Sequence, residues 1–283
     1  MKSLMTSNPL RLSNPSQLRQ YLEILGISPK KSLSQNFLID GNIIDKIISL
    51  AEINAQDQVL EIGPGPGALT DALHQHGARV LAVEKDRILA KALQERGGDI
   101  RVICEDVLKV DLEKELSERA TVIANLPYNI TSPILTSLLP KTHVFKRIVV
   151  MVQLEVAERL TASPGNKTYG SLTVFSNLFS TPQWGFKVSR RCFFPEPNVD
   201  SAVVRFDLSP PPKEVEDEAF FQLIRTAFGQ RRKMLKSSLK KLYPSSSVMQ
   251  ALAGIGFQET ARPEELSSNQ FVEFYRHLIY MRS

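Results

Sequence analysis

Residues 58–68 read Gln58-Val-Leu-Glu-Ile-Gly63-Pro-Gly65-Pro-Gly67-Ala68. The apolar first half of this segment is typical of a buried strand, and its glycines are typical of a tight turn that leads into a helix. Gly63, Gly65 and Ala68 also have the spacing G-x-G-x-x-G/A of dinucleotide-binding turns. The segment predicts a nucleotide or nucleoside site at the end of a strand, and a nicotinamide or flavin enzyme is one interpretation of it.

The two prolines of this turn argue against a dinucleotide. Backbone N–H groups at such a turn and at the start of the next helix hold a pyrophosphate, and Pro64 and Pro66 have no N–H to donate. S-adenosylmethionine carries an adenosine, an amino-acid tail and a cationic sulfonium, so it needs close approach of the backbone and nearby oxygen atoms rather than an anion site. We therefore expect Gly63 and Gly65 to contact S-adenosylmethionine.

Strand and helix patterns alternate on both sides of the turn. Short apolar runs are separated by segments with apolar residues at helical spacing. The predicted strands are residues 58–63, 79–84, 100–104, 121–124, 147–152 and 202–208, and the predicted helices are residues 16–25, 43–51, 69–76 and 88–95. This alternation predicts an α/β fold with its ligands at the carboxyl ends of parallel strands. With the S-adenosylmethionine site expected at the glycine turn, we interpret it as a Rossmann-like S-adenosylmethionine-dependent methyltransferase domain.

The pattern changes at Ser209-Pro-Pro-Pro212. Proline cannot continue a central strand because it lacks the amide hydrogen. Only helical patterns follow, at residues 218–228, 231–242, 248–252 and 269–280. We place a domain boundary near residue 210. Residues 1–210 are then the methyltransferase domain, with residues 1–30 as an N-terminal arm, and residues 211–283 are a smaller C-terminal helical domain.

The composition is that of a globular protein, with 42% hydrophobic residues, 23% charged residues and a net charge of +5. It excludes a disordered or collagen-like chain. No run approaches about 18 apolar residues, so no membrane span is expected. Cys104, Cys192 and the four histidines lack metal-ligand spacing. We expect no metal site and a reducing, cytoplasmic location.

Two carboxylates follow the second and third strands of the α/β pattern. Glu84 ends the second strand about 20 residues after the glycine turn, where a carboxylate can accept hydrogen bonds from both ribose hydroxyls. Asp106 follows the third strand, where it can accept a hydrogen bond from the adenine amino group. Because parallel strands end at the same edge of a sheet, the two carboxylates together predict a nucleoside site.

The tetrapeptide Asn125-Leu-Pro-Tyr128 follows the fourth strand and carries the predicted chemistry. The exocyclic amine of adenine is a poor nucleophile because its lone pair is delocalised into the ring. If the Asn125 side-chain oxygen and the Leu126 carbonyl each accept one N6 hydrogen, the nitrogen can become pyramidal and direct its lone pair at a methyl group. Pro127 would hold the turn rigid, and Tyr128 would stack on the base, which is worth about 1–3 kcal/mol.

The chain resembles the ribosomal RNA adenine dimethylases, in particular the bacterial enzymes that act on 16S rRNA. The segments that carry the resemblance occur in order between about Lys30 and Phe274. They are Ser34-Gln-Asn-Phe-Leu-Ile-Asp40, Glu61-Ile-Gly-Pro-Gly-Pro-Gly67, Val83-Glu-Lys-Asp86, Asn125-Leu-Pro-Tyr-Asn129, Phe193-Phe-Pro-Glu-Pro-Asn-Val-Asp-Ser201 and Phe228-Gly-Gln-Arg-Arg-Lys233.

The resemblance implies roles for particular residues. It implies that Phe193 faces Tyr128 across the target base, and that the cofactor pocket is lined by Asn36, Leu38, Gly63, Glu84, Asp106 and Asn125. The family usually has glycine where this chain has Ser34. If that position needs a positive φ, serine costs about 1 kcal/mol there.

The resemblance also implies a reaction and a partner. Two neighbouring adenosines in the 3′-terminal hairpin of 16S rRNA would be dimethylated within an immature small ribosomal subunit. Direct in-line transfer requires no general base because the product ammonium is strongly acidic, and the carbonyl oxygens at N6 would stabilise the charge that develops there. We expect the enzyme to be a monomer.

A basic segment lies in the predicted helical domain. Residues 225–241 contain no acidic residue and seven basic ones, namely Arg225, Arg231, Arg232, Lys233, Lys236, Lys240 and Lys241. A solvated basic face is one interpretation. We expect phosphate contacts instead, which would position RNA without reading its sequence.

Two further interpretations share the predicted fold. A non-catalytic RNA-binding or transcription factor is one, although the intact Asn125-Leu-Pro-Tyr128 and glycine turn speak against lost catalysis. The large-subunit rRNA methylases that give macrolide resistance are the other, since their core motifs are similar. Val199-Asp-Ser-Ala-Val203 and Gln230-Arg-Arg-Lys233 favour the small-subunit enzymes.

Overall fold

The computed structural model describes residues 11–216 and 218–280 and divides the chain into two compact units. The first unit comprises the chain up to Ala157 together with Gln183–Leu208, and the second comprises Glu158–Pro182 and the chain from Ser209 onward. The boundary predicted near residue 210 lies close to the last of these divisions. The prediction differs from the structure at residues 158–182, which are in the second unit. Residues 1–10 of the predicted N-terminal arm lie outside the described residues.

A seven-stranded sheet organises the first unit. From β4 to β6 neighbouring strands are parallel, and β9 is antiparallel to β6. The α/β prediction and its six strands are confirmed. In spatial order the strands are β4 (Ile100–Ile103), β3 (Arg79–Val83), β2 (Gln58–Ile62), β5 (Ala120–Asn125), β6 (Phe145–Gln153), β9 (Ser201–Leu208) and β7 (Ser180–Val188).

Strand β7 was not predicted from the sequence. Its residues, Ser180-Thr-Pro-Gln-Trp-Gly-Phe-Lys-Val188, contain a proline and a glycine and form no apolar run. Such a sequence is tolerated here because β7 is an edge strand, so its outer side makes no ladder within this sheet.

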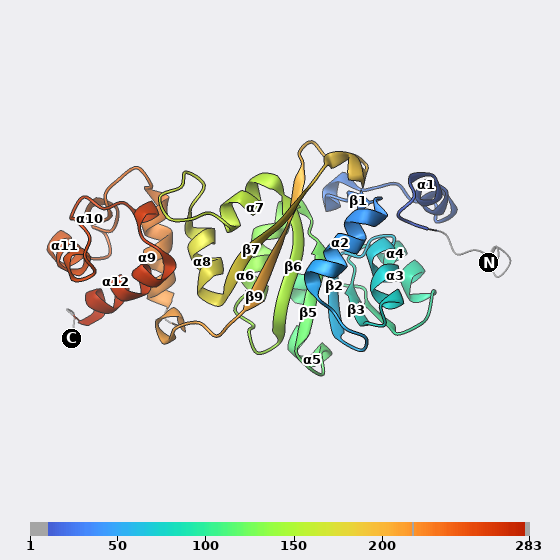
Figure 1. The fold of residues 1–283 in the computed structure, drawn as a ribbon, viewed down its shortest axis with the longest axis horizontal. Coiled ribbons are helices and arrows are strands. Elements are labelled where there is room, and N and C mark those ends of the chain that lie inside the picture. The colour runs from blue at the N-terminus through green and yellow to red at the C-terminus, as the bar shows by residue number, and fades with distance from the viewer. Residues whose placement is uncertain (1–10, 217, 281–283) are drawn as a thin grey trace. The chain divides into compact units, whose positions relative to one another are not determined.

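Helices connect the parallel strands, and several begin at an aspartate or asparagine side chain that caps them. Asp40 accepts hydrogen bonds from two backbone N–H groups in the first turn of α2, and Asp86 does the same for α4. The four helices predicted before residue 100 are confirmed as α1 to α4 (Figure 1). The helices that start in this unit are α1 (Pro15–Ile24), α2 (Gly41–Ala51), α3 (Ala68–Gln75), α4 (Arg87–Gln94), α5 (Leu112–Glu115), α6 (Thr131–Leu138) and α7 (Leu154–Leu160).

A second, two-stranded sheet joins distant parts of the first unit. β1 (Phe37–Leu38) is antiparallel to β8 (Phe193–Phe194), with Phe37 opposite Phe194 and Leu38 opposite Phe193. This pairing fixes the segment before α2 against the segment before β9. The chain between residues 30 and 40 is thereby held close to the main sheet.

The second unit is helical from Ser209 to residue 280, apart from turns (orange to red in Figure 1). Aromatic side chains form much of its interior; Phe220, for example, packs edge-on against Phe221 and Tyr275. Across residues 11–216 and 218–280 of the chain, no helix is both long enough and apolar enough to cross a membrane. The helices of this unit are α8 (Ser171–Phe179), α9 (Glu218–Gly229), α10 (Leu235–Ser238), α11 (Ser245–Gly254) and α12 (Ser268–Tyr280).

The predicted helix at residues 231–242 is wrong. The chain turns after α9, Met234 is extended with ψ of 148°, and only α10 is helical. The N–H of Leu235 donates to the carbonyl of Ala261 and not to a preceding helical turn. Arg232, Lys236 and Lys240 would be four residues apart on one face of a continuous helix, and like charges at that spacing are destabilising.

Gly67, at the start of α3, is enclosed by side chains. It has a φ of 98°, and an added Cβ would lie 2.7 Å from Arg96 Nη1 and 2.8 Å from Leu93 Cδ1. Arg96 cannot easily move away. Its Nη1 donates to Asp71 Oδ1 at 2.8 Å, and its Nη2 donates to the Pro66 carbonyl. The glycine turn is therefore held from behind by a fixed guanidinium.

Gly67→Ala is expected to lower the free energy of unfolding by clearly more than the roughly 1–2 kcal/mol that a left-handed alanine costs by itself. The excess comes from crowding against Arg96 and Leu93. Gly97→Ala is the matched control, because Gly97 has a φ of 74° and nothing within 4 Å of its added Cβ. Urea unfolding of both variants measures the difference, and equal losses would show that the space around Gly67 is not limiting.

Candidate active site

A cavity of about 150 Å³ opens at the carboxyl ends of the parallel strands. Ile62 at the end of β2 pairs with Val83 of β3 and with Ala124 of β5, so the residues that follow these strands meet at one edge. The strand order reverses between β2 and β5, which is where ligands bind in such sheets. The predicted residues that line the cavity are Asn36, Gly63, Gly65, Glu84, Asp106, Asn125, Leu126, Pro127 and Tyr128.

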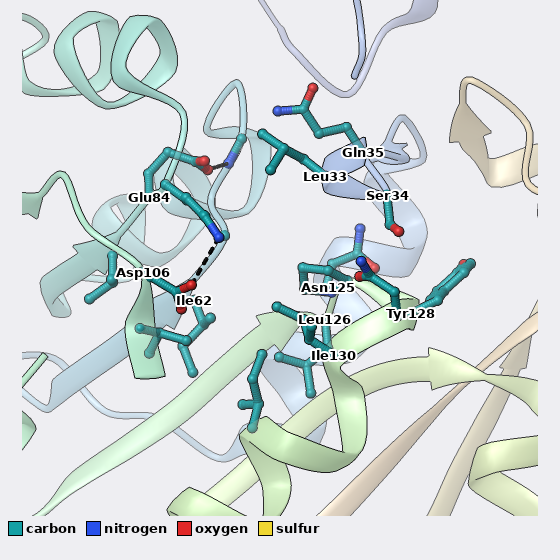
Figure 2. A pocket seen from close by; sticks show the side chains of 18 of the residues that line it. Leu33, Ser34, Gln35, Ile62, Glu84, Asp106, Asn125, Leu126, Tyr128 and Ile130 are labelled. Atoms are coloured by element: carbon teal, nitrogen blue, oxygen red, sulfur yellow. Dashed lines mark hydrogen bonds and ion pairs between the residues drawn. The ribbon is translucent and has the colours of Figure 1, made fainter. Parts of the chain in front are cut away.

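The polar side chains stand on opposite sides of this cavity. Figure 2 shows Glu84 and Asp106 on one side, Asn125 and Tyr128 on the other, and Gln35 above them. The carboxylates come from the ends of β3 and β4, whereas Asn125 and Tyr128 come from the end of β5 and the turn after it. A ligand in the cavity would therefore contact carboxylates at one end and the turn at the other.

Backbone N–H groups hold the Glu84 carboxylate in place. Its Oε2 accepts from Gly65 N at 3.0 Å, and its Oε1 accepts from Asp86 N at 2.8 Å. Burial raises the pKa of Glu84 because it penalises the charged form, and these hydrogen bonds partly oppose that effect. Each carboxylate oxygen can accept a further hydrogen bond. The group is therefore oriented, with acceptor capacity left for a ligand.

Asp106 has a cationic neighbour that the sequence did not predict. Lys85 Nζ lies 2.9 Å from Asp106 Oδ2 (dashed line in Figure 2), and Leu108 N donates to Oδ1 at 3.1 Å. The hydrogen bond from Lys85 is the largest cause of the lowered pKa of Asp106. The carboxylate thus remains ionised at neutral pH, and it can only accept hydrogen bonds in that form.

Asn125 is oriented by a residue far away in the sequence. Its Nδ2 donates to the backbone carbonyl of Asn36 at 2.8 Å, across a separation of 89 residues. A carbonyl oxygen can only accept, so the side-chain group that faces Asn36 must be the NH₂. Asn125 Oδ1 is then directed away from Asn36, and no described residue donates to it or to the carbonyl of Leu126. Two acceptors are available at the turn.

The rest of the turn is fixed by local hydrogen bonds. The Pro127 carbonyl accepts from Ile130 N at 3.2 Å and from Thr131 Oγ1 at 3.1 Å, and Leu126 N donates to Met151 O at 3.1 Å. Tyr128 is partly buried, and burial raises its pKa. Its hydroxyl lies 2.7 Å from the Ser201 hydroxyl. The tyrosine is therefore neutral and held at both ends.

Leu38 and Phe193 lie outside the main cavity. Leu38 lines a smaller cavity beside it. Phe193 is only 3% exposed, packs in the core with Leu38 and Val188 and does not line the main cavity, so its predicted place opposite Tyr128 stays a prediction. Successive side chains alternate across a strand. Pairing of β8 with β1 directs Phe193 inward and leaves Phe194 partly exposed, with the Arg19 guanidinium 4.9 Å from its ring.

Ser34 has the backbone conformation that the family glycine would adopt without strain. Its φ is 50°, in the left-handed region. A serine there costs about 1 kcal/mol relative to glycine. Its carbonyl accepts from Asn36 Nδ2 at 3.1 Å, which helps to orient the segment that carries the Asn36 carbonyl. Ser34 and Asn36 both line the cavity, so this hydrogen bond lies in the cavity wall.

The smaller cavity contains a buried acid, Glu61, for which the sequence predicted no role. The two cavities share Phe37, Gly63 and Asn125 as lining residues. Glu61 lines the smaller one, is 2% exposed, and has an Oε2 without a hydrogen-bond partner in the described part of the chain. Burial raises the pKa of Glu61 to about 8, and the Asp71 and Glu84 carboxylates add to the effect. The sequence signal that could have predicted this buried site is the glutamate among the apolar residues of β2.

The chain matches a known protein family and curated relatives over most of its length. Residues 26–279 match the family described as "Ribosomal RNA adenine dimethylase". The chain belongs to this family. It is 50% identical over 273 residues to Ribosomal RNA small subunit methyltransferase A of Protochlamydia amoebophila (strain UWE25), an alignment that covers 93% of this chain and 96% of that relative. The same-named protein of Chlamydia trachomatis serovar D is 45% identical over 276 residues, covering 94% and 98%.

Solved structures agree with the family assignment. A dimethyladenosine transferase from Plasmodium falciparum superposes with a TM-score of 0.75 at 26% identity, covering 86% of this chain and 98% of that one. The 23S rRNA methyltransferase ErmE superposes with a TM-score of 0.68 at 29% identity, covering 86% and 100%. The predicted Rossmann-like methyltransferase fold is confirmed, and so is the family resemblance.

In this adenine dimethylase the second unit carries a basic groove of about 810 Å³. Arg232, Lys233, Lys236 and Lys240 line it, as does Arg262 from beyond the predicted basic segment. Three residues of the predicted basic segment do not line the groove, namely Arg225, Arg231 and Lys241. Arg225 pairs with Glu218 at 2.5 Å, and Arg231 donates to the Asn166 carbonyl at 3.0 Å.

One of the positive charges in this groove is paired with a carboxylate, although the basic segment itself contains no acidic residue. Lys236 Nζ lies 3.2 Å from Glu259 Oε2, a residue outside the basic segment. Arg232, Lys233 and Lys240 are exposed. Together with Arg262, which is also exposed, they are the groove residues that phosphates would reach without breaking an ion pair seen in the described chain.

Glu61→Gln is expected to flatten the dependence of stability on pH. The pKa of Glu61 is raised from 4.5 to about 8 by folding, so the stability it contributes is complete below pH 4.5 and is lost as the pH rises toward 8. Wild type should therefore lose stability relative to the variant over that window, by up to about 1.4 kcal/mol per pH unit. Urea unfolding at intervals between pH 5 and 8 measures this.

Glu95→Gln is the control for this experiment, because Glu95 is exposed on the surface after α4. Its stability curve should run parallel to that of wild type. A Glu61→Gln curve that is also parallel would contradict the buried, protonated state of Glu61.

Proposed function

We propose that this chain transfers methyl groups from S-adenosylmethionine to N6 of adenosine in small-subunit ribosomal RNA and forms N6,N6-dimethyladenosine. The observation that carries the proposal is the orientation of Asn125, whose NH₂ is occupied by the Asn36 carbonyl while its oxygen is available at the cavity. The relatives named small subunit methyltransferase A support the choice of RNA.

The cavity suits S-adenosylmethionine better than a dinucleotide. Pro64 and Pro66 leave the glycine turn short of the N–H groups that a pyrophosphate needs, and the Gly65 N–H is already used by Glu84. Glu84 is placed to accept from ribose hydroxyls, and Asp106 from the adenine amino group. Gly63 and Asn36 would lie along the rest of the ligand. When bound, the donor would supply an electrophilic methyl group.

The turn after β5 would prepare the acceptor amine. Asn125 Oδ1 and the Leu126 carbonyl can each accept one N6 hydrogen, and together they favour a pyramidal nitrogen with a directed lone pair. Positive charge grows on N6 as the bond to the methyl group forms, and oriented oxygens stabilise that charge most in the transition state. Pro127 restricts the backbone between these acceptors and Tyr128, on whose ring the base would stack.

No side chain is needed as a base. The ammonium formed on N6 is strongly acidic and can lose its proton to water. The residues that follow these acceptors along the turn are Pro127 and Tyr128, which is neutral because burial raises its pKa, and neither could take a proton. Dimethylation would repeat the same transfer on the monomethylated amine, which still has one hydrogen for one of the two acceptors.

The proposed target is a pair of neighbouring adenosines in the 3′-terminal hairpin of 16S rRNA, presented by an immature small subunit. The family resemblance suggests this target. An unpaired loop fits the cavity because proteins recognise specific RNA bases chiefly where they are unstacked. The groove of the second unit would hold the backbone through phosphate contacts.

A 23S rRNA methyltransferase is the alternative function that a particular observation favours, since ErmE superposes over 86% of this chain. Its identity of 29% is well below the 50% shared with the small-subunit enzyme of Protochlamydia amoebophila. Incubation of the protein with labelled S-adenosylmethionine and separate unmethylated subunits distinguishes the two. Label in 16S rRNA supports the proposal, and label confined to 23S rRNA would refute it.

Asn125→Ala is expected to abolish detectable methyl transfer while changing donor affinity only modestly, because Asn125 is assigned to the amine. Transfer is measured with labelled donor, and donor affinity by calorimetry. Asn42→Ala, on the exposed side of α2, is the control and should behave like wild type. Full activity of the Asn125 variant would remove this residue from the mechanism.

Replacing both Lys233 and Lys240 by Glu is expected to weaken RNA binding and to lower the slope of log K against log salt by about 0.7–0.9 per lost phosphate contact. Lys241→Glu is the matched control, since it is an exposed neighbour that does not line the groove. Filter binding over a range of salt concentrations measures the slope. If the double variant keeps the wild-type slope, the groove is not part of the RNA interface.

A further inference from the structure

A buried serine lies behind the tyrosine of the active-site turn. Ser201 is the first residue of β9 and pairs with Gln153 at the end of β6. It is fully buried, with 0% exposure. Its hydroxyl oxygen is 2.7 Å from the hydroxyl oxygen of Tyr128, and either atom can be the donor. The position of this serine is set by the central sheet and not by the turn itself.

Burial of a hydroxyl at this site calls for an explanation. A hydroxyl removed from water costs free energy unless it is hydrogen-bonded, and an alanine in the same place would avoid that cost. The flanking residues of β9, Ala202, Val203 and Val204, are apolar and fully buried. The Tyr128 hydroxyl is the partner that makes a serine favourable in this strand.

The hydrogen bond gives Tyr128 a second point of attachment. Its backbone is fixed by the turn, where Leu126 N donates to Met151 and Ile130 N donates to the Pro127 carbonyl. Its hydroxyl is fixed by Ser201, 73 residues away in the sequence. The hydroxyl oxygen lies on the axis about which the ring turns, so the bond to Ser201 fixes the direction of that axis. Because a phenolic hydroxyl makes its hydrogen bonds close to the plane of its ring, the fixed position of Ser201 also favours one ring plane before any base arrives.

We infer that Ser201 is a positioning residue that holds the Tyr128 ring in the orientation in which the target base stacks. The inference rests on the proposed function of the cavity. Ser201 touches neither the base nor the donor in this assignment, and it acts through Tyr128 alone. Ordering of the ring in advance lowers the entropy cost of base binding.

Ser201→Ala is expected to lower kcat/KM for a small-subunit rRNA substrate about three- to tenfold, the change that one net hydrogen bond corresponds to. The dissociation constant for S-adenosylmethionine should stay within twofold of wild type, because the donor residues are untouched. Ser176→Ala is the matched control, since Ser176 is also fully buried and hydrogen-bonded but lies in α8. Its kcat/KM should be that of wild type.

A double-mutant cycle separates positioning from a purely structural role. Tyr128→Phe removes the same hydrogen bond from the other side and should show a similar loss. The double variant should be no worse than either single variant if Ser201 acts only through the Tyr128 hydroxyl. Wild-type kcat/KM in Ser201→Ala, or losses that multiply in the double variant, would overturn the inference.

The activity of Tyr128→Phe and an NMR signal from the Tyr128 ring test the role of Ser201 in two further ways. If Ser201→Ala does not fold, Tyr128→Phe alone carries the test, and wild-type kcat/KM in that variant overturns the inference. In protein labelled with ¹³C at tyrosine Cζ, Ser201→Ala should shift the signal that disappears in Tyr128→Phe. This signal needs no RNA, so its shift establishes the hydrogen bond even if the chain methylates another substrate; an unshifted signal overturns the inference.

Discussion

The hydrogen bond from Asn125 Nδ2 to the Asn36 carbonyl is the constraint on which the proposed chemistry depends. It determines which end of the asparagine amide faces the cavity, and only the oxygen end can accept a hydrogen from an adenine amine. The bond exists because β1 pairs with β8 and holds the segment around Asn36 against the main sheet. Catalytic geometry in this protein thus follows from how a short N-terminal segment is fixed to the end of β5.

Much of the site could be predicted because it follows from strand order. The glycine turn and Glu84 come directly after β2 and β3, Asn125 is the last residue of β5, and Asp106 lies shortly after β4. In a parallel sheet such positions share an edge whatever the loops do. The prolines of the turn were equally informative, because the loss of an N–H donor is a local property that needs no structure. These residues line one cavity, as strand-end position implies.

The features that the sequence did not predict depend on contacts between distant segments of the chain. Ser201 and Tyr128 are 73 residues apart, and nothing in either sequence segment indicates their hydrogen bond. Phe193 was given a role by resemblance, whereas pairing of β8 with β1 directs its ring into the core. Residues 231–242 have helical spacing, but Ala261 takes the N–H of Leu235 and interrupts the helix. Only in residues 231–242 did a tertiary contact outweigh a local pattern; the other two features depend on contacts that no local pattern indicates.

The most direct test of this account is a crystal structure with S-adenosylhomocysteine and a small-subunit rRNA hairpin. We predict that N6 of an extruded adenosine lies about 3 Å from both Asn125 Oδ1 and the Leu126 carbonyl, the usual distance for such hydrogen bonds. The base should stack on Tyr128, with the donor sulfur on the far side of N6 from these oxygens. An Asn125 amide turned the other way, with its NH₂ toward the base and the Asn36 carbonyl unbonded, would contradict the central claim.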